Sequence, residues 1–322
     1  MMQAARTALG AGLAGARRVN GFFKARPLLQ IGLGLGLIAL LLAIFWDELS
    51  LALFEVRPAF VLASAAVSMT LFPLAAARWF LIADALCGTA RIGSYRDFLK
   101  ARVLVGLAGF VGAREVVEFG GRTAWLAARP GVTLGRAAQV TLIDRLSDLY
   151  VSGVCFLGAL AHWALGAPAT LAAALVVLLP LLLFLPILFL LRLRVPPRGP
   201  RMVRIVEDLS AIRGREMPVF ALSYAKFMLI VARVFLLMQA TAMGLGVTHA
   251  LASVPVGQSI YLISITPGSL GFYELGWAAL LQAMSVGGAA IVSFVILLRG
   301  VVVFSVVWLL PFFPLLRGRD MT

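Results

Sequence analysis

The feature that most constrains this chain is a succession of apolar segments, each long enough to cross a lipid bilayer. A helical span needs about 20 predominantly apolar residues. The chain is 62% hydrophobic and 13% charged, whereas a soluble domain is typically about half apolar and a quarter charged. We therefore predict an all-α polytopic membrane protein with about six full transmembrane helices. They are expected at 28–46, 57–86, 137–162, 168–191, 217–243 and 288–314.

Two further apolar segments are interrupted in the middle. The segment 100–135 contains several glycines and charged residues, and the segment 250–285 is broken at Thr266-Pro267-Gly268-Ser269-Leu270-Gly271. Each can hold two half-helices but not two full spans, so both are predicted to be re-entrant. Non-helical backbone at membrane depth is tolerated where it is buried in protein or lines a cavity. Both breaks are therefore predicted to lie beside a cavity.

The basic residues predict the orientation. The N-terminus 1–27 has five basic residues and no acid, and the loop 192–216, expected to form a surface helix, has seven arginines. The loops 163–168 and 244–250 have no Lys or Arg. Under the positive-inside rule, both termini, including the tail 315–322, lie in the cytoplasm of a bacterial inner-membrane protein. The first span is expected to be retained, with an organellar transit peptide as the alternative. Although the net charge is +14, the basic residues lie in short loops between apolar segments, which argues against nucleic-acid binding.

The order of spans suggests an inverted repeat of 28–162 and 163–314. Each half reads as two spans, a re-entrant pair and a third span, so an odd number of crossings inverts the second half. Ionisable residues recur at a matching spacing, because Arg78, Glu118 and Arg145 precede Arg233, Glu274 and Arg299 by 155, 156 and 154 residues. Inverted repeats with broken helices are typical of alternating-access transporters.

Ionisable side chains inside the spans are the candidate site, because each costs several kcal/mol at membrane depth unless it is paired or hydrated. The alternative is that each acid only neutralises an arginine of a neighbouring helix. Glycine and proline at the second break are added, since an unwound tip could hold an anion; a plain tight turn is the alternative. The candidates are Arg78, Arg114, Glu118, Arg122, Asp144, Arg145, Asp148, Arg233, Pro267, Gly268, Gly271, Glu274 and Arg299.

Spacing gives some of these residues an expected geometry. Arg114 and Arg122 flank Glu118 at four residues on either side, so all three share one face of a continuous helix; a break at Gly120-Gly121 is the alternative. Asp144 and Asp148 also share a face, which suits either proton coupling or an ion pair with Arg78 or Arg299. Lys226 is expected to extend toward the cytoplasmic surface.

No enzymatic site is visible. The chain lacks G-x-S-x-G, Walker A, HExxH and CxxC patterns, and Cys87 and Cys155 are isolated thiols in apolar surroundings. His162 and His249 fall at predicted outer ends of spans and receive no role. We therefore expect neither a cofactor nor a metal site.

Several motifs resemble the lysylphosphatidylglycerol synthase transmembrane (flippase-like) family. They are Glu118 with Arg122, Gly131-Val132-Thr133, Asp144-Arg145-Leu146-Ser147-Asp148, Thr266 to Glu274, and Arg299. The resemblance runs from about Arg78 to Arg299. The chain departs from the family pattern where the acid Glu118 lies one residue early and where Ser269 replaces a glycine. Because the sequence ends at Thr322 without a soluble aminoacyl-transferring domain, the resemblance implies lipid translocation rather than lysine transfer.

These observations together predict a translocase for an anionic or aminoacylated phospholipid or a related lipid. Arg114, Arg122, Arg145 and Arg299 would neutralise the phosphate, while Glu118 and Glu274 would hold those arginines or a cationic headgroup. The alternative is a non-transporting partner or scaffold for a lipid-modifying or envelope-biosynthesis enzyme. An intramembrane enzyme is a third, weaker reading. A homo-oligomer is left open, because Gly32, Gly34 and Gly36 permit close helix contact.

Overall fold

The computed structural model describes residues 56–111, 114–192, 214–263, 266 and 269–312, and within these ranges it contains helices and no strand. The predicted first span 28–46, most of the basic loop 192–216 and the tail 315–322 lie outside the described residues. The helices are α4 (Pro58–Cys87), α5 (Thr89–Ile92), α6 (Tyr95–Val111), α7 (Arg114–Ala127), α8 (Leu134–Trp163), α9 (Ala169–Arg192), α11 (Glu216–Ala240), α12 (Val247–Ile263), α13 (Phe272–Ala283) and α14 (Gly288–Val307), followed by a 3-10 turn at Leu310–Phe312.

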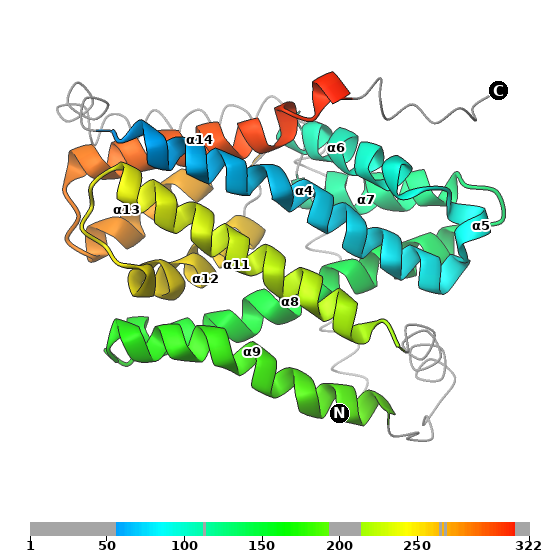
Figure 1. Cartoon of the computed structure of the whole chain (residues 1–322), viewed down its shortest axis with the longest axis horizontal. Helices are drawn as coiled ribbons and strands as arrows, with labels where there is room; N and C mark the ends of the chain where they lie inside the picture. The colour runs from blue at the N-terminus through cyan, green and yellow to red at the C-terminus, as the bar shows by residue number, and fades with distance from the viewer. Residues whose placement is uncertain (1–55, 112–113, 193–213, 264–265, 267–268, 313–322) are drawn as a thin grey trace, which may run out of the picture.

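Two long helices, α4 and α11, lie side by side through the middle of the bundle (Figure 1). The α6–α7 pair lies toward one end of α4 and α11, and the α12–α13 pair lies toward the other end (Figure 1). Helix α8 packs against α7, α12 and the central pair, and α9 covers α8 from outside. The interrupted segments of the sequence are therefore placed at opposite ends of a common central pair.

Three of these helices, α4, α11 and α14, are long and apolar enough to cross a membrane. Helix α8 is equally long at 30 residues, which is about 45 Å at 1.5 Å per residue, but it carries Arg136, Asp144, Arg145 and Asp148. Helix α14 ends at Val307 rather than continuing to 314. The apolar helices establish a membrane protein, and the charges gathered on α8 mark the region of the site.

Each predicted re-entrant segment contains two helices, as the interrupted patterns suggested. The first pair runs from Tyr95 to Ala127, so it begins five residues before the predicted range of 100–135 and ends eight residues before the end of that range. Helix α7 continues through Gly120 and Gly121, so the alternative of a break there is wrong. Close packing explains why a glycine occupies position 121, because a Cβ atom added there would lie 3.1 Å from the side chain of Val105 of α6. The glycine thus lets α7 approach α6 closely.

Large buried aromatic side chains hold the helix pairs to the rest of the bundle. Trp79 of α4 packs edge-on against Phe98 of α6, with ring centroids 4.7 Å apart, and both contact Trp125 of α7. In the second pair, Trp277 of α13 is fully buried and lies directly over Gly257 of α12. Burial of a large apolar side chain of this kind stabilises the fold by roughly 1.5–3 kcal/mol.

Local sequence fixes several helix ends near the site. Pro58 occupies the first turn of α4, where its missing N–H costs nothing. The hydroxyl of Thr133 caps α8 by accepting the N–H of Arg136 at 3.3 Å. Gly271 precedes α13 with φ of +80°, a left-handed conformation that favours glycine. This conformation turns the chain into α13 and places Glu274 in the first turn of that helix.

Candidate functional site

A cavity of about 370 Å³ lies at the centre of the described helices. It receives residues from α4, α6, α7, α8 and α11 to α14, so both helix pairs contribute to its wall. Its polar lining consists of Arg102, Glu118, Arg145, Asp148, Ser152, Ser223, Lys226, Arg233, Gln258, Tyr273 and Ser305. Its apolar lining consists of Leu71, Phe72, Ala75, Gly106, Phe119, Leu149, Val151, Phe227, Ile230, Val302 and Val306. The cavity wall therefore combines charged hydrogen-bond donors with an apolar surface.

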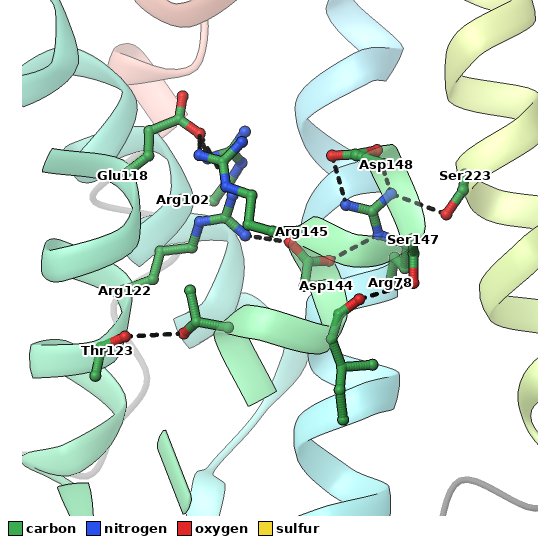
Figure 2. Close-up of polar contacts among 12 residues, drawn as sticks. Arg78, Arg102, Glu118, Arg122, Thr123, Asp144, Arg145, Ser147, Asp148 and Ser223 are labelled. Atoms are coloured by element: carbon green, nitrogen blue, oxygen red, sulfur yellow. Dashed lines mark hydrogen bonds and ion pairs between the residues drawn. The ribbon is translucent and has the colours of Figure 1, made fainter. Parts of the chain in front are cut away.

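Arg78 of α4 organises the ion pairs beside this cavity. Its Nε donates to Asp144 at 2.7 Å, Nη2 donates to Asp148 at 2.8 Å, and Nη1 donates to both Asp148 and Ser223, the latter at 2.9 Å. Figure 2 shows the guanidinium between the two carboxylates of α8, with Ser223 reaching it from α11. The side chain is 1% exposed. One buried arginine thus ties α4 to α8 and α11.

Glu118 of α7 is the second centre of the network. Its Oε2 accepts from Arg102 Nη1 at 2.9 Å, from Arg122 Nη2 at 3.3 Å and from Arg145. Arg122 also donates to Asp144, which links the Glu118 group to Arg78 (Figure 2). The sharing of one face by Glu118 and Arg122, expected from their spacing, is confirmed. The ion pairs therefore run without interruption from α6 and α7 through α8 to α4.

Lys226 of α11 closes the network at its other end. Its Nζ donates to Asp148 Oδ2 at 2.6 Å, and the side chain is 17% exposed. The expectation that Lys226 extends to the cytoplasmic surface is wrong. Helix α11 begins at Glu216, so Lys226 lies about 15 Å along it, and the nearest counter-charge is a carboxylate of α8.

Five cations share three carboxylates in this network. The cations are Arg78, Arg102, Arg122, Arg145 and Lys226, and the carboxylates are Asp144, Asp148 and Glu118. Removing one partner of a buried ion pair typically costs roughly 3–5 kcal/mol, because the other charge is left buried. The free-energy cost of separating the ion pairs thus stabilises this arrangement. Because the cations outnumber the carboxylates, the network has an excess of positive charge.

A second, smaller group lies on α13 and α14. Arg299 Nε donates to Glu274 Oε1 at 2.5 Å, so these two predicted residues form an ion pair. Glu274 Oε2 also accepts the N–H of Gly271 at 2.8 Å, which caps the start of α13. Neither Glu274 nor Arg299 is among the residues that line the cavity.

The predicted site residues thus separate into groups. Arg78, Glu118, Arg122, Asp144, Arg145 and Asp148 come together in one network, and Arg233, which is 6% exposed, lines the same cavity from α11. Gly271, Glu274 and Arg299 form the second group. Arg114 begins α7, but its side chain lies outside the described part, and so do Pro267 and Gly268.

Sequence reasoning missed Arg102, Lys226 and Ser223. Lys226 could have been found by counting its distance from the start of its span, whereas Arg102 lies at the start of the interrupted segment 100–135, whose charged residues were considered only around its glycines. Ser223 lies three residues before Lys226, one helical turn away on the same face. Among the described residues, no group of three or more His, Cys, Asp or Glu could hold a metal ion.

Comparison with known protein families matches residues 29–309 to the lysylphosphatidylglycerol synthase TM region. The match covers nearly the whole chain and includes every residue of both groups. No curated protein and no solved structure gives a significant match.

Proposed function

The chain belongs to the family of the lysylphosphatidylglycerol synthase TM region, and from this membership we propose that it is a membrane lipid translocase. It moves the headgroup of an anionic or aminoacylated phospholipid, or of a related lipid, across the bacterial inner membrane. Both termini lie in the cytoplasm, as the distribution of basic residues favours.

The observation that carries this proposal is the double character of the central cavity. Its charged wall suits a phosphate, which prefers guanidinium and ammonium donors. Its apolar wall, with Leu71, Phe72, Ile230, Val302 and Val306, suits the first carbons of an acyl chain. A cavity that only stabilised the fold would be expected to be filled or uniformly apolar, because packed interiors hold few voids.

Different cations have different tasks in this account. Arg145, Lys226, Arg102 and Arg233 line the cavity and contact the headgroup. Arg78 and Arg122 are each 1% exposed and engaged by Asp144, so they position the wall. Arg122, expected from sequence to neutralise the phosphate directly, is therefore assigned to positioning instead.

We further infer that the chain is an inverted repeat of six spans, an architecture that suits transport. The ion pair of Glu118 with Arg145 has a counterpart in Glu274 with Arg299, at sequence offsets of 156 and 154. Ser68 and Ser223, 155 residues apart, are both buried and each donates to the carbonyl four residues earlier. Two halves of opposite orientation that share one cavity can expose it alternately to each side of the membrane.

The proposal is tested by lipid exchange between leaflets in proteoliposomes. Purified protein is reconstituted with fluorescent phosphatidylglycerol, and the fraction of label reached by a membrane-impermeant quencher is followed over time. Wild type is expected to expose label faster than protein-free liposomes, and Arg145→Gln is expected to lose most of that gain. Arg96→Gln, an exposed arginine of α6 outside the cavity, is the matched control. Equal rates for wild type and protein-free liposomes would refute translocation.

A non-transporting scaffold for a lipid-modifying enzyme is the second candidate. It is favoured by the pair of Glu274 and Arg299, which neutralise each other and do not line the cavity. Under this reading, disruption of that pair lowers only the yield of folded protein. Translocation by the folded wild type would then be absent in the proteoliposome assay.

A further inference from the structure

Each carboxylate on the cavity wall is already shared by two or more of the protein's own cations. Asp148 accepts two hydrogen bonds from Arg78 and a third from Lys226. Glu118 accepts from Arg102, Arg122 and Arg145 through a single oxygen. An ammonium group entering the cavity would have to compete with at least two protein cations for each of these carboxylates. The described wall therefore has little to offer a cationic ligand.

Arg102, by contrast, has hydrogen-bond donors that are not filled by the described residues. A guanidinium has five N–H donors. Among the described residues, Arg102 makes a hydrogen bond from one of them, Nη1, to Glu118. Its Nε is buried and has no hydrogen-bond partner in the described part of the chain. The side chain is 7% exposed, lines the cavity and lies over the ring of Phe72 at 5.4 Å. Buried donors without acceptors are costly, so an acceptor-rich ligand would stabilise this group.

Lys226 adds further donors on another wall. Its ammonium group has three N–H donors, of which one is directed to Asp148 at 2.6 Å. Arg102 on α6 and Lys226 on α11 line the same cavity. The lining as a whole contains four cations, Arg102, Arg145, Lys226 and Arg233, and two carboxylates, Glu118 and Asp148.

We propose that the cavity selects a lipid whose headgroup carries a phosphate and no ammonium group. Arg102 and Lys226 are the cations that bind the phosphate. This inference rests on the proposed lipid translocation and narrows its substrate class. A phosphatidylglycerol-type headgroup supplies acceptors to the unfilled donors. A lysyl-phosphatidylglycerol headgroup adds positive charge to a wall that already has it in excess.

A soluble phosphate ester could offer the same anionic chemistry. The apolar half of the cavity argues for a lipid, because Leu71, Phe72, Ile230, Val302 and Val306 would face a soluble ester without any apolar group to cover them. Glycerol 3-phosphate, the same phosphate without chains, is therefore expected to compete poorly.

Lipid binding tests this selectivity separately from transport. Full-length protein in micelles is incubated with equimolar phosphatidylglycerol and lysyl-phosphatidylglycerol, and retained lipid is measured by native mass spectrometry. We expect about a tenfold preference for phosphatidylglycerol, the ratio that corresponds to about 1.4 kcal/mol. Arg102→Gln should remove most of this preference, Arg102→Lys should retain part of it, and Arg96→Gln should leave it unchanged. An excess of glycerol 3-phosphate should displace little lipid.

The outcomes separate this inference from the proposed function. Equal or stronger retention of lysyl-phosphatidylglycerol would overturn the selectivity, even if both lipids are translocated in proteoliposomes. Unchanged preference in Arg102→Gln would overturn the role of Arg102, and displacement by glycerol 3-phosphate would overturn the lipid. Selective retention without movement between leaflets would support the inference and refute translocation.

Discussion

Arg78 and Asp148 meet through two parallel hydrogen bonds, from Nη1 to Oδ1 and from Nη2 to Oδ2, the second at 2.8 Å. This fork joins α4, one of the two central helices, to α8, and Lys226 of α11 shares the same carboxylate. Bidentate pairs of this kind fix geometry as well as charge. Asp148 is thus the point at which three helices of the cavity wall are held together.

Replacing Asp148 with Asn should therefore destabilise the protein strongly. The change leaves Arg78 with one buried counter-charge, Asp144, and deprives Lys226 of its partner. We expect a loss of roughly 3–5 kcal/mol, the typical cost of breaking a buried ion pair, measured as a lower melting temperature in detergent.

The matched control is Asp97→Asn, because Asp97 and its partner Arg129 are 29% and 28% exposed and 3.8 Å apart. Ion pairs that remain in contact with solvent contribute about 0–1 kcal/mol, and the Asn side-chain oxygen can still accept the Ser94 N–H that Asp97 accepts at 3.0 Å, so this variant should melt close to wild type. Similar losses in the two variants would contradict a special role for the buried network.

Gly257→Ala should weaken the α12–α13 pair. An added Cβ would lie 2.6 Å from ring atoms of Trp277, which is fully buried and cannot move aside easily. Overpacking of this kind costs roughly 1–3 kcal/mol. Thermal unfolding in detergent measures the change.

Gly120→Ala is the opposite case on α7, since nothing lies within 4 Å of its added Cβ. Alanine there should stabilise by roughly 0.5–1 kcal/mol, because glycine loses more backbone entropy in a helix. If both variants shifted the melting temperature in the same direction, the packing account of Gly257 would fail.

The sequence predicted those parts of the site that follow from spacing or from the cost of burying charge. Glu118 and Arg122 were placed on one helix face because four residues make about one turn. An ion pair of Asp144 or Asp148 with Arg78 was one of the alternatives that their spacing left open. Arg102 was missed because its burial depends on where α6 begins, whereas Lys226 lies well inside a span whose start was predicted within one residue. The start of α6 packs against α4 through the rings of Phe98 and Trp79, a tertiary contact that local hydropathy does not reveal.

The second group offers a sharper lesson. Holding an arginine was one of the two roles expected of Glu274, and it pairs with Arg299, but its hydrogen bond to the Gly271 N–H was not anticipated. The three-residue spacing from a helix-starting glycine to a glutamate could have signalled this cap. The sequence left open whether this turn binds an anion or is a plain tight turn, and the protein's own Glu274 carboxylate accepts the Gly271 N–H at the start of α13.

Because Glu274 has two partners, exchanging its charge with that of Arg299 should not restore the wild type. In the double variant Glu274→Arg with Arg299→Glu, the ion pair can reform, but the Gly271 N–H loses its acceptor. We expect recovery of part of the stability lost in Glu274→Arg alone, short by about 1 kcal/mol, the usual worth of a helix cap. Full recovery of the melting temperature would show that the cap contributes nothing.

The excess positive charge of the cavity should be visible in thiol labelling. In a Cys87→Ser background, Ser152→Cys places a thiol on the cavity wall. An anionic methanethiosulfonate should modify it roughly tenfold faster than a cationic one, because like charge is repelled from the recess. Val292→Cys, at a fully buried position of α14, should react with neither reagent. Equal rates at residue 152 would contradict the charge assigned to the cavity.

The central claim is that a lipid headgroup enters the cavity between the helices. Photo-crosslinking with phosphatidylglycerol that carries a diazirine beside its phosphate tests this most directly, with adducts mapped by mass spectrometry after proteolysis. We predict adducts on the wall formed by α8 and α11, at 145–152 and 223–230, and their loss in Arg145→Gln. Adducts confined to outward-facing positions, such as Leu62 of α4 and Leu171 of α9, which are 71% and 50% exposed, would contradict the claim.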